Sequence, residues 1–457
     1  MAEIAPFHGW TYDFDRLGDP ASVLAPPYDV ISPEEQEALY AASPYNVIRL
    51  ILGKKKTGDS DWDNRYTRTA EILKRWVAAD LLVRSPAPAF HVTSLTYDPG
   101  DGSGSKTRWG VIGLVRIEDE GSPVILPHER TFSAHKDDRL RLMRATGAQF
   151  SQIFALYEDP SNDVLGSFRA SLERSPDLAF EYTDGTSHRV WAVRDRTVFP
   201  AAAAAMRERS LLIADGHHRY ETARNYRNFM RARHGHRPSD RSHEFTMMYL
   251  SNMADPGLTV LPSHRLIRFL GDERETAFPK GVERWFEVSP LPWTLSEAPD
   301  RASAMRELIA KAGRDTVAFA HFRRGNEKGL LLRLRPGAER ELGGDLHPSL
   351  RKLDVLVLSR LIFQRSLGYS LEALDNEDRF TYESDMGRAL GSVASGACEM
   401  GFFLNPTRIE HVREVASNRL VMPRKSTYFF PKVLSGLVFN RMDPHELIQT
   451  PQPLRPR

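Results

Sequence analysis

The sequence predicts an α+β or mixed α/β fold with mixed sheets. Short apolar runs of strand length, such as residues 211–214, alternate with longer segments whose apolar residues recur at helical spacing, as in 62–82. Segments 89–97 and 107–118 flank the glycine-rich stretch 100–104, which indicates a β-hairpin. The fold should therefore combine antiparallel pairing with strand–helix alternation.

Helices and strands are expected along most of the chain. Ser32, Pro33 and Glu35 form a capping-box start for a helix that ends near residue 42. The apolar run 46–52 is expected to be a strand. The other expected helices are 62–82, 136–147, about four turns from near His218, 281–287, 301–312, 351–368, 384–397 and 406–418. The other expected strands are 153–157, 188–194, 211–214, 245–251, 316–323, 329–335 and 400–404.

Length and composition are those of a globular protein with several packed units. Of the 457 residues, 41% are hydrophobic and 27% are charged, which excludes a disordered chain. We expect an N-terminal mixed α/β unit at 1–150, a central unit at 151–345 and a helix-rich C-terminal unit at 346–457, or one interwoven domain.

Charge, cysteine content and the N-terminus limit which partners and which cellular compartment are expected. The formal net charge of +2 provides no general attraction to nucleic acid or acidic membranes. Cys398 is the only cysteine, which excludes an internal disulfide and a cysteine-based zinc cluster and favours a reducing compartment. Neither a signal peptide nor an apolar segment of membrane-spanning length is recognisable. We therefore expect a cytoplasmic protein whose partners are small molecules.

The segment LLIADGHHRYETARNY carries the strongest functional signal. An apolar strand ends at Asp215, Gly216 permits a sharp turn, and the next helix opens with His217, His218 and Arg219. Free backbone N–H groups, the positive end of a helix dipole and a guanidinium therefore meet at one place, an arrangement that binds phosphate. The histidines could move a proton, and Asp215 could hold a histidine tautomer or a metal-bound water.

This corner also has a structural interpretation, in which Asp215 only caps the helix and both histidines are solvated. We favour the functional one, because five polar or special residues directly after a buried strand are more than a cap requires.

Two further acidic segments could contribute to a site. Asp29 lies in the proline-stiffened segment 26–32 and could be a base, a metal ligand or an ordinary turn acid before a helix cap. Residues 127–131 offer a carboxylate among cations and would suit an anionic substrate. For the nearby Lys136 and Arg139 we favour the structural interpretation, a solvated helix face.

The segment MPRKSTYFFPK is the last candidate. Lys425, Ser426 and Thr427 resemble a phosphate-binding trio, although the glycines of a P-loop do not precede them. Alternatively, these residues only flank an aromatic strand.

Several of these segments, in this order, resemble the bacterial and archaeal family catalogued as domain of unknown function 1015, and the resemblance covers nearly the whole chain. They are APPYDVIS, HERTFSAHKDDRLRLMRATGAQFSQIFALYED, LLIADGHHRYETA, LPSHRL and VMPRKSTYFFPKVLSGLV.

The motif DGHHRYETA also resembles, more distantly, the phosphate-binding motif of the ParB and sulfiredoxin-like superfamily. That superfamily includes CTP-dependent partition proteins, sulfiredoxins and free-serine kinases. The resemblance implies that Gly216, His218 and Arg219 contact phosphate at a strand–turn–helix nucleotide corner, and that Asp29 or Glu129 is the base for a substrate hydroxyl. No sulfiredoxin cysteine lies beside the motif, and the near-neutral charge argues against a DNA-partition role.

Residues and resemblance together predict a nucleotide-dependent phosphotransferase that acts on a small hydroxyl-bearing metabolite, such as free serine. ATP or ADP with Mg²⁺ would be the cofactor, and Arg219, Lys425 and the helix N-terminus would neutralise its phosphates. Two alternatives remain, a non-catalytic regulator that binds a nucleotide or phosphometabolite, and a metal-dependent hydrolase using the histidines. The candidate catalytic residues are Asp29, Glu129, Asp215, His217 and His218. The candidate cofactor-binding residues are Gly216, His218, Arg219, Lys425, Ser426 and Thr427.

Overall fold

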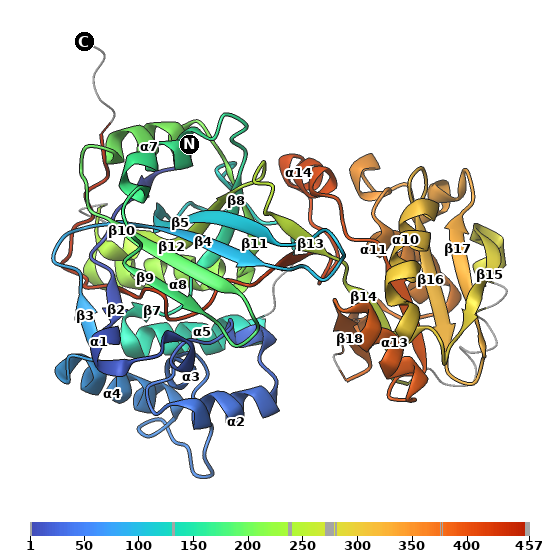
Figure 1. The fold of residues 1–457 in the computed structure, drawn as a ribbon, viewed down its shortest axis with the longest axis horizontal. Coiled ribbons are helices and arrows are strands. Elements are labelled where there is room, and N and C mark those ends of the chain that lie inside the picture. Colours follow the sequence, from blue (N-terminus) through green and yellow to red (C-terminus); the bar gives the residue numbers. More distant parts are fainter. Residues whose placement is uncertain are drawn as a thin grey trace. The chain divides into compact units, whose positions relative to one another are not determined.

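The chain folds into two compact units in the computed structural model (Figure 1). The first comprises Met1–Pro127, Thr131–Leu258 and Pro431–Arg457, and the second His128–Arg130 and Thr259–Phe430. The structure describes residues 2–129, 133–235, 240–269, 278, 281–374, 376 and 378–452, with the backbone alone for 133–135.

A mixed sheet forms the centre of the first unit. Within the described residues it has nine strands, in the order β6-β11-β8-β12-β5-β4-β10-β9, with β1 paired to β5. The pairs β11–β6 and β12–β8 are parallel, whereas the hairpin β4–β5 and the other pairs are antiparallel. The expectation of a mixed α/β fold with mixed sheets is thus confirmed. The strands are β1 (Ile4–Ala5), β4 (Phe90–Tyr97), β5 (Lys106–Arg116), β6 (Ile125–Leu126), β8 (Ile153–Tyr157), β9 (Leu178–Glu181), β10 (Ser187–Val193), β11 (Leu211–Asp215) and β12 (Phe245–Asn252).

Helices surround this sheet. Helices α5 and α8 pack together around Met143, Tyr226 and Met230, and Figure 1 shows α2, α3 and α4 grouped beside α5. The helices are α1 (Phe14–Leu17), α2 (Pro33–Ala42), α3 (Ile48–Ile51), α4 (Arg65–Ala78), α5 (Ser133–Thr146), α6 (Asp163–Gly166), α7 (Phe199–Arg207) and α8 (His217–His234), with 3₁₀ turns at Pro20–Ser22, Tyr28–Val30, Arg169–Leu172 and Ser242–Glu244. Short strand pairs are β2 (Trp10–Tyr12) with β3 (Leu82–Arg84) and β7 (Ala148–Gln149) with β21 (Asn440–Arg441).

The second unit is built on an antiparallel sheet. Its six described strands run in the order β15-β17-β16-β19-β14-β18. They are β14 (His264–Ile267), β15 (Phe286–Thr294), β16 (Ala318–Arg323), β17 (Lys328–Leu334), β18 (Phe380–Glu383) and β19 (Met400–Leu404), while β13 (Thr259–Leu261) pairs with β20 (Tyr428–Phe430). The helices are α10 (Ala302–Ala312), α11 (Asp354–Val357) with its π-helical continuation Leu358–Ser366, α12 (Leu371–Leu374), α13 (Met386–Ala394) and α14 (Ile409–Ser417); 3₁₀ turns lie at Pro299–Arg301, Ala338–Leu342 and Pro348–Leu350.

Two expected elements are wrong. The run 46–52 forms the helical turn α3 instead of a strand, since the Asn46 side chain accepts a hydrogen bond from the Ile48 amide at 2.9 Å and so starts a turn. Ile48 and Ile51 are both buried there, and an apolar run buried all round fits either element. Residues 281–285 are helical as expected, but strand β15 begins at Phe286, inside the expected helix.

The borders expected near residues 150 and 345 do not coincide with the two units. Strand β8, just after the first border, pairs with β12 and β11 in the sheet that also contains β4 and β5. The chain then leaves the first unit after Leu258 and returns to it at Pro431. Because strand pairing joins distant segments, a division drawn along the sequence could not anticipate this return.

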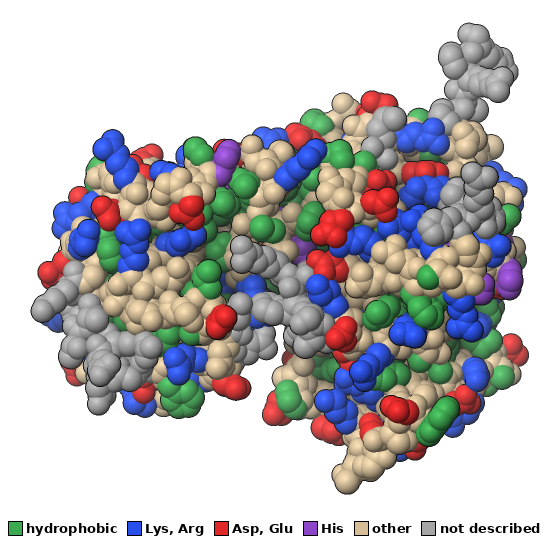
Figure 2. Space-filling view, turned by 180° about the vertical axis from the view of Figure 1, so that it is seen from behind, with side chains coloured by type: hydrophobic (Ala, Val, Ile, Leu, Met, Phe, Trp, Pro, Cys, Tyr) green, Lys and Arg blue, Asp and Glu red, His purple; other side chains and the backbone are tan. Residues whose placement is uncertain are grey.

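Charged side chains of both signs are interspersed over the visible face of each unit (Figure 2). This distribution agrees with the near-zero net charge. None of the described helices is both long and apolar enough to cross a membrane.

Candidate functional site

The predicted corner lies at the junction of β11 and α8. Strand β11 ends at Asp215, and Gly216 has the left-handed backbone conformation, with φ of 88°, at the N-cap of α8. A Cβ at this glycine would lie 2.8 Å from Nε of Arg219, so the guanidinium packs over the glycine backbone. No side chain caps α8, and Asp215 is therefore not the helix cap of the structural interpretation.

Asp215 binds two cations instead. Its carboxylate accepts a 2.6 Å hydrogen bond from Nζ of Lys432 and a second bond from the Arg219 guanidinium. The three side chains are only 10–14% exposed. Burial alone would raise the pKa of Asp215, but Lys432 and Arg219 hold it well below its ordinary range. Asp215 is thus a permanent carboxylate, unsuited to be a general base near neutral pH.

Several buried polar groups around Arg219 have no hydrogen-bond partner in the described part of the chain. Arg219 donates to the carbonyl of Gln152, but its Nε is unsatisfied. The side-chain amide of Gln152, 1% exposed, and the hydroxyl of Thr222, fully buried, are also unsatisfied. A buried polar group without a partner costs about 1–3 kcal/mol, so such a cluster is a place where a ligand or ordered water is expected.

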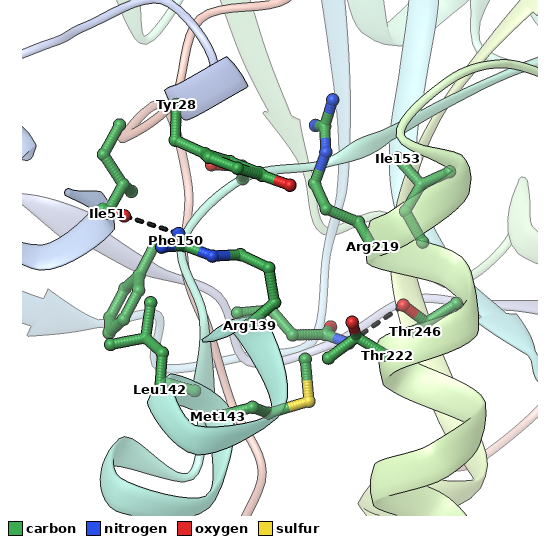
Figure 3. Close-up of a pocket in the computed structure, with 13 residues that line it drawn as sticks. Tyr28, Ile51, Arg139, Leu142, Met143, Phe150, Ile153, Arg219, Thr222 and Thr246 are labelled. Atoms are coloured by element: carbon green, nitrogen blue, oxygen red, sulfur yellow. Dashed lines mark hydrogen bonds between the residues drawn. The ribbon is translucent and has the colours of Figure 1, made fainter. Parts of the chain in front are cut away.

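Arg219 and Thr222 line a cavity of about 50 Å³ beside the corner (Figure 3). Figure 3 shows the Tyr28 ring between Arg139 and Arg219, with its hydroxyl toward the Arg219 side chain. The Arg139 guanidinium lies 4.1 Å from the centre of that ring. Burial and the neighbouring Asp29 raise the pKa of Tyr28, so its hydroxyl remains a hydrogen-bond donor. The cavity has room for a few waters or a phosphate-sized anion, and not for a whole nucleotide.

The other predicted site residues of the first unit are Asp29, His217 and His218. Asp29 is exposed in the turn Tyr28–Val30. Burial lowers the pKa of Arg219, but Asp215 and then Asp29 raise it and outweigh burial, which brings Asp29 into the electrostatic environment of the corner. His217 is buried, and its ring helps to lower the pKa of Asp215, whereas His218 is half-buried.

Lys136 and Arg139 differ in how exposed their side chains are. Lys136 pairs with Glu221 at 2.9 Å, and both side chains are 27% exposed, in agreement with the structural interpretation. Arg139 is only 8% exposed and lines the cavity, so its expected place on a solvated helix face is wrong.

Glu129, Ser426 and Thr427 meet in the second unit. The Glu129 carboxylate accepts hydrogen bonds from the Ser426 amide at 3.1 Å and the Thr427 hydroxyl at 3.5 Å. Thr427 also contacts Nε2 of His128 at 3.0 Å. The two residues that follow Glu129, Arg130 and Thr131, lie outside the described residues.

Lys425 precedes this cluster in a strained conformation, with φ of 53°. Its carbonyl accepts a 2.8 Å hydrogen bond from the buried Arg265. The corner belongs to the first unit and this cluster to the second, so the expected convergence of Glu129 and Lys425 on Arg219 stays a prediction.

Sequence reasoning missed some residues of the corner. Lys432 ends the candidate segment MPRKSTYFFPK, but no local pattern distinguishes it, because its partner Asp215 lies 217 residues away in the sequence. Thr222 stands three residues after Arg219, a spacing that places both on one helix face and could have indicated it. No sequence signal points to Gln152, because it contacts Arg219 through its backbone carbonyl, which any residue type could supply.

The described residues offer no cluster of metal-ligating side chains. They contain no group of three or more His, Cys, Asp or Glu side chains that could hold a metal ion.

The corner and most of the chain fall within a region that matches a known protein family. The model of the family described as "Protein of unknown function (DUF1015)" matches residues 4–356. The chain belongs to this family. No curated protein matches the sequence.

The chain also shows a low similarity to three solved structures. A free serine kinase in complex with AMP is 14% identical, with 70% of this chain and 86% of that chain covered and a TM-score of 0.33. A conserved hypothetical protein from Pyrococcus furiosus is 14% identical, with 69% and 89% covered and a TM-score of 0.32. SbnI with a C-terminal truncation, from Staphylococcus aureus, is 10% identical, with 71% and 85% covered and a TM-score of 0.32.

Proposed function

We propose that the chain binds the phosphates of a nucleotide at the corner Asp215–Arg219 and transfers a phosphoryl group to a small hydroxyl-bearing metabolite, with free serine as a candidate. The observation that carries this proposal is the pair of cations, Arg219 and Lys432, held on one buried carboxylate at the N-terminus of α8. The two cations exceed the charge of the Asp215 carboxylate, and the helix N-terminus adds to this positive charge, which the nearby Asp29 partly offsets.

An incoming phosphate would find donors already oriented. The Arg219 guanidinium has an unused Nε donor, and the Thr222 hydroxyl lies in the wall of the same cavity. The absence of a side chain at Gly216 lets the Arg219 guanidinium pack directly over the turn, where it can meet an anion at the helix N-terminus. Phosphoryl transfer needs mainly positioning and charge neutralisation, which these groups supply. The resemblance of DGHHRYETA to a phosphate-binding motif supports the same assignment.

The general base would be Asp29 or Glu129, since Asp215 is tied to two cations. Asp29 is exposed and therefore available to a substrate hydroxyl. Mg²⁺ is usually bound by one or two carboxylates together with substrate phosphates, and if Glu129 is the base, Asp29 near the corner would be able to take this role instead. The ion would supply charge neutralisation at the phosphates.

Binding is tested by calorimetric titration of the whole protein with ADP and ATP. Arg219→Ala should lose about 2–3 kcal/mol of binding free energy, which is roughly a thirty- to more than hundredfold loss of affinity. Arg219→Lys should restore part of it, because an ammonium keeps the charge but loses the planar fork. Arg233→Ala, at the exposed far end of the same helix, is the matched control and should bind as the wild type does. Equal affinities of wild type and Arg219→Ala would exclude a phosphate site at this corner.

A second candidate function is a regulator that binds the same phosphates without catalysis. The salt-bridged state of Asp215 favours it, because that carboxylate cannot act as a base. Turnover of labelled ATP or ADP with serine and other small hydroxyl compounds separates the two. Nucleotide binding with no transfer to any of these acceptors would support the regulator.

A further inference from the structure

The second unit contains a cavity of about 580 Å³ that none of the predicted site residues lines. It lies at one end of the antiparallel sheet, where β16 begins after Val317, β17 ends at Leu334 and β19 ends before Asn405. This volume falls in the range of small-molecule sites. A cavity at a sheet end, with walls from several elements, can present convergent polar groups.

Asp354 is the central polar group in the wall of this cavity. It opens helix α11, and its carboxylate accepts a long hydrogen bond of 3.5 Å from Nδ2 of Asn405, together with bonds from the backbone amides of Asn405 and Asp354. The side-chain amide of Asn405 also donates to the carbonyls of Ile309 and Ala318, at 3.3 and 3.2 Å, and so is shared among three acceptors. Burial raises the pKa of Asp354 to about 7, despite the Asn405 bond and the charge of Arg408. Asp354 lines the cavity, and among the described residues no Lys or Arg side chain forms a salt bridge with it, so its carboxylate is hydrogen-bonded but has no cationic partner.

The position of Asn405 depends on Gly313 at the end of α10. A Cβ at Gly313 would lie 2.5 Å from Nδ2 of Asn405, so this glycine makes room for the amide. The glycine carbonyl in turn accepts a 3.2 Å hydrogen bond from Arg408. Gly313, Asn405 and Arg408 therefore form a connected wall next to Asp354.

Basic side chains predominate around the mouth. Arg314, Arg351, Lys352, Arg408 and His411 line the cavity, against the acids Asp315 and Glu339. Burial is the main cause that lowers the pKa of His411; Arg408 and Lys352 act in the same direction, whereas Glu414 and Glu410 oppose them. Arg351 donates to the carbonyls of Leu346 and Gly343 at 3.0 and 3.2 Å, so it is held in place.

We propose that this cavity binds a small zwitterionic metabolite, with its protonated nitrogen at Asp354 and its anionic group at Lys352 and Arg408. A cationic nitrogen would give this carboxylate a charge-assisted bond that no described side chain supplies. The anionic end would meet the basic rim. An anion alone would leave Asp354 without a cationic partner, and a cation alone would meet repulsion from the rim.

The proposal is tested on the whole protein by calorimetric titration. The zwitterionic probes are L-glutamate and O-phospho-L-serine, the anionic probes acetate and inorganic phosphate, and the cationic probe ethanolamine. At least one zwitterion should bind saturably, and at least tenfold more tightly than the single-charge probes. Arg219→Ala should leave this binding intact, which separates it from binding at the corner.

Two variants of the cavity complete the test. Asp354→Asn keeps the side-chain shape and should weaken zwitterion binding tenfold or more. Lys352→Ala, an exposed position, should weaken it severalfold without affecting the fold. ADP binding at the corner should be unchanged in both. No saturable zwitterion binding, equal binding of phosphate alone, or unchanged affinity in both variants would overturn the proposal.

Proton release gives an independent readout. Near pH 7 about half of the Asp354 carboxyl is protonated, so capture of a cationic nitrogen should release about half a proton per site. The other titratable groups that line the cavity are Arg314, Arg351, Lys352, Arg408, Asp315, Glu339 and His411, and the lowered pKa of His411 favours its neutral form near pH 7. Titrations in buffers of different ionisation enthalpy measure the release, and Asp354→Asn should abolish it.

Discussion

Lys432 donates a 2.6 Å hydrogen bond to Asp215, although 217 residues of sequence separate the two. The contact returns the C-terminal segment of the chain to the corner at which β11 becomes α8. It also gives the buried Asp215 carboxylate a second cation besides Arg219. The phosphate site that we propose thus depends on a residue from the end of the chain.

The Lys432–Asp215 pair should be energetically coupled. Lys432→Met should lower the free energy of unfolding by about 1–3 kcal/mol, because the buried carboxylate loses a charged hydrogen bond. The double variant with Asp215→Asn should lose less than the sum of the two single variants, by about 0.5–3 kcal/mol. Urea unfolding measures all four proteins.

The matched control for this cycle is Lys136→Met. Its salt bridge to Glu221 is similar in length but more exposed, so the loss should be only about 0–1 kcal/mol. Strict additivity in the Lys432–Asp215 cycle would show that the contact contributes nothing specific.

Gly216→Ala and Gly235→Ala should separate backbone strain from site damage. Both glycines have left-handed φ, 88° and 80°, at the two ends of α8, so each alanine should destabilise the fold by about 1 kcal/mol or more. Only at Gly216 would the new Cβ meet Arg219, whereas nothing lies within 4 Å at Gly235. Nucleotide affinity by calorimetry should therefore fall in Gly216→Ala alone. A similar fall in Gly235→Ala would indicate that α8 as a whole, not the corner, governs binding.

Asp29→Asn and Glu129→Gln distinguish the two candidate bases. If Asp29 is the base, Asp29→Asn should lower kcat by about a hundredfold or more and leave thermal stability within about 0.5 kcal/mol, because the side chain is exposed. Glu129→Gln should instead reduce stability, since Glu129 accepts bonds from Ser426 and Thr427. Steady-state phosphotransfer and thermal unfolding measure both. Full activity of Asp29→Asn would leave Glu129 as the candidate base.

Asp354 should make the second unit less stable at higher pH. A carboxyl whose pKa is near 7 in the folded state and about 3.9 when unfolded binds more protons in the folded state between these values. Stability from this group is therefore greatest below about pH 4 and falls as the pH rises to about 7, then levels off. Asp354→Asn should remove this dependence and be more stable than wild type at pH 8, with little difference at pH 4. Parallel pH profiles of the two proteins in thermal unfolding would contradict the prediction.

Local sequence signals predicted the elements whose information lies within a few residues. The capping box at Ser32 and Glu35 forms as expected, because both partners lie in one helical turn. The turn at Gly216 was predictable for a similar reason, since a glycine after an apolar run tolerates left-handed φ. The run 46–52 was misjudged, because burial on all sides removes the periodicity that separates strand from helix.

The sequence by itself determined the mixed α/β class, the strand–turn–helix corner and the residue types gathered there, because periodicity, capping and turn preferences act over short distances. Only the tertiary structure decided which distant groups complete the corner. Lys432, Gln152 and Tyr28 reach Arg219 or its partner Asp215 through strand pairing and chain return. The same holds for the cavity at Asp354, whose walls come from the ends of three strands and from three helices. Long-range packing sets these contacts, and no local pattern encodes which buried groups will meet.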